Sequence, residues 1–179
     1  MLGTQQMATK KKTNGAVQSR TAARSASAPV DAIDLLTGDH REVDGYFEKF
    51  KSAKSAADKK DLAERICAAL RVHAQIEEEL FYPAARKAIK DNDLLDEAFV
   101  EHAGAKILIA EIEAMQPGMP LYDAKVTVLG EQIRHHVKEE EGELFPKVRD
   151  SGVELTTLGS TMAQRKAELM ELLAAAALI

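Results

Sequence analysis

The chain has 179 residues, a formal net charge of −5, a single cysteine, no tryptophan and only 4% aromatic residues. This length suits one domain, and the composition favours helices over a β-sandwich or a β-barrel. The single cysteine, Cys67, excludes an internal disulfide framework and any metal cage built from cysteines. No apolar stretch approaches the roughly 20 residues of a membrane helix, and the N-terminus lacks an apolar signal core, so we expect a cytoplasmic protein without a membrane partner.

Charge separates the first 30 residues from the rest of the chain. Residues 1–30 hold five basic and no acidic side chains, which leaves 19 basic and 29 acidic side chains, a balance of −10, for residues 31–179. The first segment has too few large apolar residues to form a core, so we predict a disordered basic tail over 1–30 and one helical domain over 31–179. A targeting sequence or a nucleic-acid-binding arm stays open for the tail, whereas the acidic body argues against a nucleic-acid partner.

Acidic residues and prolines mark where the first two helices should begin and end. Pro29 followed by Asp31 predicts a helix over about 31–53, because an aspartate can cap the free N–H groups of the first turn. Two further aspartates precede apolar residues at helical spacing and predict a second helix over about 59–82. This helix should end or kink near Pro83, because proline has no N–H to donate and crowds the preceding turn.

The second half of the chain repeats this organisation. Apolar residues spaced by threes and fours predict helices over about 92–115 and 122–145, separated by the segment QPGMP, with Pro146 closing the second of them. Residues 154–178 have the pattern of a fifth amphipathic helix. The expected fold class is therefore all-α: an antiparallel up-down four-helix bundle with an additional C-terminal helix.

An internal repeat relates the two halves. The segments HAQIEEELFYP and HHVKEEEGELFP place a histidine, two glutamates and a proline at matching positions, each pair 63 residues apart. His40 and His102 are 62 residues apart. Four of the five histidines take part in this correspondence, which predicts two related helix hairpins with the same side-chain chemistry at the same depth.

The spacing within each repeat brings nitrogen and oxygen donors together. Residues four apart on an α-helix share one face, so His73 and Glu77 project together, and His136 and Glu140 do likewise. Counting from the loops places the four repeated histidines within one turn of a common level. Buried imidazoles and carboxylates need a compensating charge, which metal cations would supply. Donors without thiolate favour iron, then manganese or zinc, and six donors suit two metals better than one tetrahedral zinc.

The segments DHREV, HAQIEEELFYP, EHAGA and HHVKEEEGELFP resemble, in this order, the hemerythrin-like HHE cation-binding family over about residues 31–150. The resemblance implies a non-haem centre of two iron ions with an oxo or hydroxo bridge. Matching the motifs residue by residue implies six metal ligands: His40, His73, Glu77, His102, His136 and Glu140. The reversible oxygen carriers of the family have a further histidine where this chain has Lys106, so reversible oxygen carriage is not expected.

Two functions stay open on this basis. The first is a di-iron protein, monomer or homodimer, that senses or handles a small ligand: oxygen, nitric oxide or peroxide. The second is a catalase-like or peroxidase-like di-iron enzyme that decomposes hydrogen peroxide, and a bundle with degenerate, empty ligand positions is a third reading. A ferritin-like oxidase does not fit, because its Glu-x-x-His spacing would need glutamates where the chain has Leu70, Phe99 and Ile133.

The sequence also predicts roles for residues beside the six candidate ligands. Glu78 and Glu141 follow the glutamates but lie off their face, so they should support the ligands or be solvated. His135 is rotated by about 100° from its neighbour and should be partly exposed or a supporting residue. Lys106 could reach toward the site or extend outward, and the outward course is the expected one. Packing in the core or at its rim is expected for four aromatic residues: Tyr46, Phe81, Tyr82 and Phe145.

Overall fold

A computed structural model describes residues 1–3, 30–90 and 92–176 of the chain. In chain order its elements are α1 (Ala32–Ser52), α2 (Ala56–Ile76), the π-helical segment η1 (Glu77–Phe81), α3 (Tyr82–Ala88), α4 (Asp93–Glu113), α5 (Tyr122–Glu139), the π-helical segment η2 (Glu140–Leu144), α6 (Phe145–Asp150) and α7 (Leu155–Ala176). The expected disordered tail falls almost wholly outside the described residues. Among the described helices, none has the length and apolar character needed to cross a membrane.

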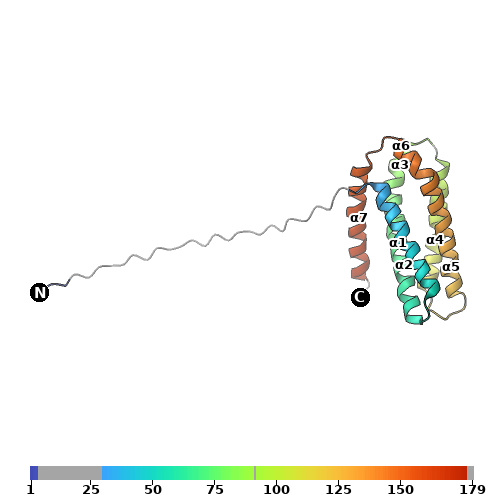
Figure 1. The fold of residues 1–179 in the computed structure, drawn as a ribbon, viewed down its shortest axis with the longest axis horizontal. Helices are drawn as coiled ribbons and strands as arrows, with labels where there is room; N and C mark the ends of the chain where they lie inside the picture. Colours follow the sequence, from blue (N-terminus) through green and yellow to red (C-terminus); the bar gives the residue numbers. More distant parts are fainter. Residues whose placement is uncertain (4–29, 91, 177–179) are drawn as a thin grey trace.

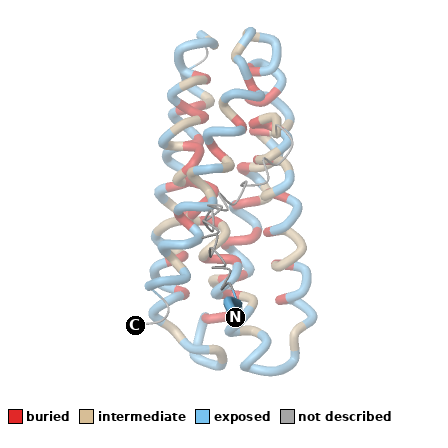
Figure 2. The backbone as a smooth tube through the Cα atoms, turned by 90° about the vertical axis from the view of Figure 1, so that its left-hand side faces the viewer, coloured by how far each residue is buried: buried red, intermediate tan, exposed pale blue. Residues whose placement is uncertain are grey.

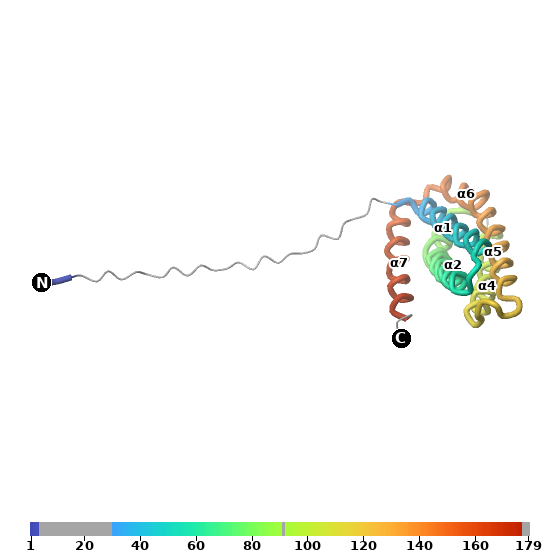
Figure 3. The backbone as a smooth tube through the Cα atoms, turned by 60° about the horizontal axis from the view of Figure 1, so that its bottom comes forward, coloured from blue at the N-terminus to red at the C-terminus, as the bar shows by residue number. Residues whose placement is uncertain are grey.

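The four long helices form an antiparallel ring (Figure 1). Helix α1 packs against α2 and α4 packs against α5, and contacts of α1 with α5 and of α2 with α4 close the ring. Helix α7 lies outside the ring, against α1 and α2 (Figure 3). The arrangement confirms the all-α fold, a four-helix bundle with an additional C-terminal helix.

The helix starts follow the capping expectation closely. The side chain of Asp31 accepts hydrogen bonds from the backbone N–H groups of Ile33 at 2.9 Å and Asp34 at 3.3 Å, which satisfies donors that the first turn leaves free. Helix α2 begins earlier than the aspartate pattern indicated, because Ser55 is its cap and accepts from the N–H of Asp58 at 3.0 Å.

The helix ends at the two prolines differ from the expectation. Helical backbone continues beyond Pro83 and Pro146, so the prediction that Pro146 closes the fourth helix is wrong. In both places a π-helical segment comes directly before, and the N–H of Tyr82 bonds to the carbonyl of Glu77, five residues earlier. The wider turn leaves each proline in the first turn of the next helical segment, where its missing N–H is tolerated.

Buried residues occur along the whole length of the bundle (Figure 2). The apolar ones form two clusters, one on each side of a polar layer. One cluster gathers around Leu36, Ile76, Phe81 and Leu144 and includes residues of α7. The other gathers around Val43, Leu70, Ile109 and Ile133. The polar layer between them is therefore enclosed by apolar packing at both ends.

Helix α7 approaches the start of α1 at a glycine. A Cβ atom at Gly159 would lie 2.1 Å from the carbonyl oxygen of Val30 and 2.6 Å from the backbone nitrogen of Ala32. Those partners are backbone atoms that cannot rotate away, so this close contact requires glycine.

Candidate metal centre

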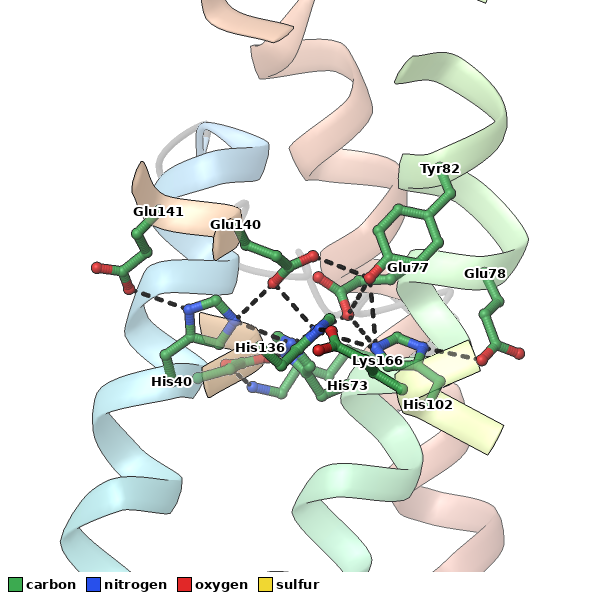
Figure 4. Close-up of polar contacts among 12 residues, drawn as sticks. His40, His73, Glu77, Glu78, Tyr82, His102, His136, Glu140, Glu141 and Lys166 are labelled. Atoms are coloured by element: carbon green, nitrogen blue, oxygen red, sulfur yellow. Dashed lines mark hydrogen bonds and ion pairs between the residues drawn. The ribbon is translucent and has the colours of Figure 1, made fainter. Parts of the chain in front are cut away.

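The polar layer consists of the residues that the repeat singled out. Among the described residues, the buried polar or charged side chains are six, each at most 7% exposed: His40, His73, Glu77, His102, His136 and Glu140. Helices α1, α2, α4 and α5 contribute one histidine each, and the two glutamates are the first residues of η1 and η2. The structure thus brings together all six candidate ligands (Figure 4).

The four histidines meet in two pairs. The Nε2 atoms of His40 and His73 lie 3.1 Å apart, and those of His102 and His136 lie 3.2 Å apart. Each pair belongs to one helix hairpin, α1 with α2 or α4 with α5. The ring nitrogens within a pair are therefore close enough to bind the same metal ion.

Each glutamate reaches both pairs. Oε2 of Glu77 lies 3.1 Å from Nε2 of His73 and 3.4 Å from Nε2 of His102. On the other side, Oε2 of Glu140 lies 3.3 Å from Nε2 of His40 and 3.4 Å from Nε2 of His136. Because each carboxylate lies between the two histidine pairs, both carboxylates are placed where they could bridge two metal ions.

The residues present fit a metal on chemical grounds. Oε1 of Glu77 and Oε2 of Glu140 are buried and accept no hydrogen bond from the described residues. A buried carboxylate oxygen without a hydrogen bond is costly, whereas a cation beside it would compensate its charge. The donor atoms are imidazole nitrogens and carboxylate oxygens without thiolate, a set that suits iron, manganese or zinc.

Each imidazole meets a second carboxylate at its far nitrogen. Nδ1 of His40 contacts Glu141 at 3.0 Å, and Nδ1 of His102 contacts Glu78 at 2.9 Å. An Nδ1–H that donates to a carboxylate fixes the ring and leaves the Nε2 lone pair facing the centre. Glu78 and Glu141 therefore support the histidines, which is one of the two roles the sequence left open for them.

Two further supporting carboxylates were missed by the sequence reasoning. Nδ1 of His136 contacts Oε2 of Glu101 at 2.7 Å, and Nδ1 of His73 lies 3.5 Å from Oδ2 of Asp39. The second distance is long for a hydrogen bond, so this contact is an ion pair only. Asp39 and Glu101 directly precede the two lone histidines and share their spacing of 62 residues, a signal that could have identified them.

Two lysines neutralise two of these carboxylates. Lys106 donates to both oxygens of Glu78 at 2.6 Å, and Lys166 of α7 donates to Oδ1 of Asp39. Of the two courses that the sequence left open for Lys106, the structure combines both: the side chain is 43% exposed, and its ammonium group contacts the carboxylate that supports His102. The ammonium group of Lys106 stays near the polar layer because Glu78, on the neighbouring segment η1, accepts its hydrogen bonds.

Tyr82 and Phe145 occupy matching positions but make different contacts. Both are buried, as expected for packing residues. The Tyr82 hydroxyl, however, donates to Oε1 of Glu140 at 2.8 Å and lies 3.3 Å from Nε2 of His102. The Phe145 ring stacks on His40 with ring centroids 5.8 Å apart. Sequence periodicity indicated burial of Tyr82 and gave no sign of its polar contacts.

The pKa values of residues in the polar layer reflect its buried negative charge. Burial lowers the pKa of His73, but the charge of Glu77 and the contact with Asp39 outweigh burial and raise this pKa to about 10. Burial also raises the pKa of Glu77, but His73 and His102 outweigh it and hold this pKa well below its ordinary value. Burial, and then the charges of Glu77 and Glu140, raises the pKa of Tyr82 well above its ordinary value. Glu77 thus stays ionised and requires positive charge, from imidazolium protons or from metal ions.

A largely apolar cavity of about 250 Å³ adjoins the four histidines. Its walls include Val43, Leu70 and Ile109 from three helices of the ring. It also reaches Lys166 and Met170 of α7, and Met170 is exposed. The cavity therefore offers a small molecule a route between the surface and the polar layer.

His135 lies apart from the centre, as the sequence indicated. Its side chain is 65% exposed and pairs with Glu139 at 3.2 Å on the surface of α5. Its Nε2 also lies 3.7 Å from Oε1 of Glu101, so His135 meets the centre through this supporting carboxylate. His135 is exposed whereas His136 is buried, which makes His135 a control for His136.

Comparisons with known proteins agree with this geometry. A family model described as the Hemerythrin HHE cation binding domain matches residues 31–148. A protein named DNA nickase from Nostoc sp. (strain PCC 7120) is 28% identical over 138 residues, covering 77% of this chain but 39% of that protein. The crystal structure of a Hemerythrin HHE cation binding domain-containing protein from Mycobacterium kansasii superposes with a TM-score of 0.67 and 26% identity, covering 78% of this chain and 87% of that one. The chain belongs to the hemerythrin HHE cation-binding domain family.

Proposed function

We propose that the chain binds two iron ions and senses or handles oxygen, nitric oxide or peroxide at them. His40 and His73 would hold one iron, and His102 and His136 the other. Glu77 and Glu140 would each contribute to both. The observation that carries the proposal is the pair of buried carboxylate oxygens without a hydrogen bond, within a layer of six converging donors. Family membership supports metal binding, and the nitrogen and oxygen donor set supports iron.

Bound iron would supply open coordination positions and a reversible change of oxidation state. The protein supplies the remainder of the site. Four carboxylates orient the imidazole rings through their Nδ1 atoms, and apolar clusters on both sides keep bulk water away from the layer. The cavity beside the histidines gives small ligands access. We place the protein in the cytoplasm, and its use of a single cysteine supports that location.

A second candidate is a catalase-like or peroxidase-like enzyme acting at the same metals. The cavity wall carries polar groups near the histidines, among them Asp39, Lys106 and Lys166. These groups would hydrogen-bond a peroxide on its way to the centre. Peroxide decomposition is therefore the alternative that the geometry favours over an inert metal store.

The name of the Nostoc relative does not extend the proposal to DNA. The match covers only 39% of that protein at 28% identity. Residues 31–179 hold 19 basic and 29 acidic side chains, whereas a DNA-binding face needs excess positive charge to meet the phosphates. Nicking activity is therefore not part of the proposed function.

The test uses purified full-length protein loaded with iron. Elemental analysis should find two irons per chain, and the absorption spectrum should change on adding nitric oxide or peroxide. An oxygen electrode then separates the two candidates: rapid oxygen release from peroxide, lost in His73→Ala but kept in His135→Ala, would establish the enzyme. Ligand-induced spectral changes without oxygen release would support sensing or handling. A wild-type chain that binds no iron would contradict both.

A further inference from the structure

The donors around the two histidine pairs are not grouped equally closely. Among the described residues, histidine and carboxylate donor atoms within 4.8 Å of one another form one buried set of four: His40, His73, Glu77 and Glu140. The other buried set has three members: Glu77, His102 and His136. Glu140 is outside this second set although its Oε2 lies 3.4 Å from Nε2 of His136. The donors around the α4–α5 pair are therefore less closely grouped than those around the α1–α2 pair.

The hydroxyl of Tyr82 lies beside the donors of this smaller set. It is 3.3 Å from Nε2 of His102, 3.5 Å from Oε2 of Glu77 and 2.8 Å from Oε1 of Glu140. Donor atoms bound about 2.0–2.2 Å from one metal ion lie about 3 Å apart when they are at right angles. The hydroxyl thus stands among the candidate ligand atoms and not behind them (Figure 4).

Packing holds this hydroxyl in place. Tyr82 is fully buried. Its ring lies against His102 at a centroid distance of 5.5 Å, Phe99 at 5.3 Å and Phe81 at 6.1 Å. A side chain enclosed in this way has little freedom to turn its oxygen away from the centre.

The matching residue of the other half carries no donor. Phe145, 63 positions after Tyr82, stacks on His40 with an interplanar angle of 6°. The half with the more closely grouped donors thus has a phenyl ring at this position, and the other half has a phenol. The phenol is therefore on the side where the histidine and carboxylate donors are less closely grouped.

We propose that Tyr82 is a seventh metal ligand, which binds the iron held by His102 and His136 through its phenolate oxygen. This inference rests on the proposed function, because it needs iron at the centre. On coordination the phenol O–H bond is replaced by an oxygen–iron bond and the proton leaves to solvent, without a change of oxidation state. Tyrosinate binds iron in other proteins, and here it would make the two irons chemically different.

The competing arrangement is a Tyr82 that keeps its proton and only donates to Glu140. The two arrangements differ spectroscopically, because a phenolate bound to ferric iron absorbs visible light by charge transfer and a phenol does not. Resonance Raman excitation within that band enhances tyrosinate ring vibrations, which identify the ligand as tyrosine. The measurement reports coordination directly and does not depend on activity.

The experiment uses the full chain, loaded with iron and oxidised, with iron counted in every sample. Wild-type protein should hold two irons and show tyrosinate vibrations. Tyr82→Phe should retain iron and lose these vibrations completely. Tyr46→Phe is the matched control, because the Tyr46 hydroxyl bonds to Glu42 at 2.7 Å and not to the polar layer; its spectrum should be unchanged.

The outcomes separate this inference from the proposed function. Two bound irons without tyrosinate vibrations, or vibrations that persist in Tyr82→Phe, would overturn the assignment of Tyr82 and leave the di-iron proposal standing. A wild-type chain without bound iron would overturn both. If Tyr82→Phe fails to fold, the other two of the three tyrosines are replaced instead. Tyrosinate vibrations that survive both Tyr46→Phe and Tyr122→Phe belong to Tyr82. Their loss in either variant contradicts the assignment.

Discussion

The two halves of the bundle match at the donors and in how these donors are supported. In each half, the residue before the lone histidine supports the second histidine of its own hairpin: Asp39 supports His73 and Glu101 supports His136. The residue after each glutamate instead supports the lone histidine of the opposite hairpin. The repeat therefore extends beyond the six candidate ligands to the carboxylates behind them.

The halves differ in what surrounds this common frame. A phenol faces the α4–α5 pair, and a phenyl ring faces the α1–α2 pair. Helix α7 packs against the α1–α2 hairpin, and its Lys166 reaches Asp39. The comparison teaches that the repeated positions bring the donors together, whereas the unrepeated positions would give each metal its own environment.

The strongest test of the matching halves replaces one glutamate at a time. Glu77→Gln and Glu140→Gln keep the side-chain size but remove a negative charge that both histidine pairs share. Each should weaken iron binding by more than the roughly 10–100-fold expected for losing a supporting contact, and by similar amounts. Iron titration of the two variants beside His135→Ala checks this. A variant that kept one tightly bound iron would show that its glutamate serves a single metal.

The packing of α7 against the α1–α2 hairpin can be tested at Gly159. Gly159→Ala would force a Cβ into the backbone of Val30 and Ala32, so the free energy of unfolding should fall by roughly 1–3 kcal/mol. Gly104→Ala in α4 is the control, because a Cβ there meets nothing within 4 Å; it should gain about 0.5–1 kcal/mol from helix propensity. Urea unfolding measures both, and equal stability of the two variants would contradict the close packing of α7.

The two lysines allow a sharper comparison of the halves. Lys166→Met and Lys106→Met keep an apolar stem but remove the charges beside Asp39 and Glu78. We expect each to speed iron release to a chelator by roughly tenfold, at the low end of the effect of supporting residues. If Lys166→Met left the release rate unchanged while Lys106→Met raised it, α7 would serve packing alone.

The smallest effect is expected at Cys67, which lies in the apolar cluster that contains Val43 and Leu70. Cys67 is buried, and burial raises the pKa of its thiol to about 12. At pH 8 the thiol stays protonated, because its pKa lies above the pH, so a thiol reagent should label the folded protein very slowly and the urea-unfolded protein fully. Rapid labelling of folded protein would show that this apolar cluster opens.

The sequence predicted the donors because local spacing alone determines which residues share a helix face. His73 with Glu77 and His136 with Glu140 needed only the helical repeat, and the matching motifs supplied the lone histidines. Lys166 was beyond such reasoning, since it lies 127 residues from Asp39 and meets it only through the packing of α7. The π-helical segments also escaped prediction, because one wider turn before a proline leaves the apolar periodicity almost unchanged.

The central claim is that the two halves together hold a pair of metal ions. Native mass spectrometry of the iron-loaded full chain, compared with Glu77→Gln and Glu140→Gln, measures this most directly. We predict a mass increase of two irons for the wild type and a loss of bound iron in both variants. A wild-type chain that took up one iron or none at saturating iron would contradict the account.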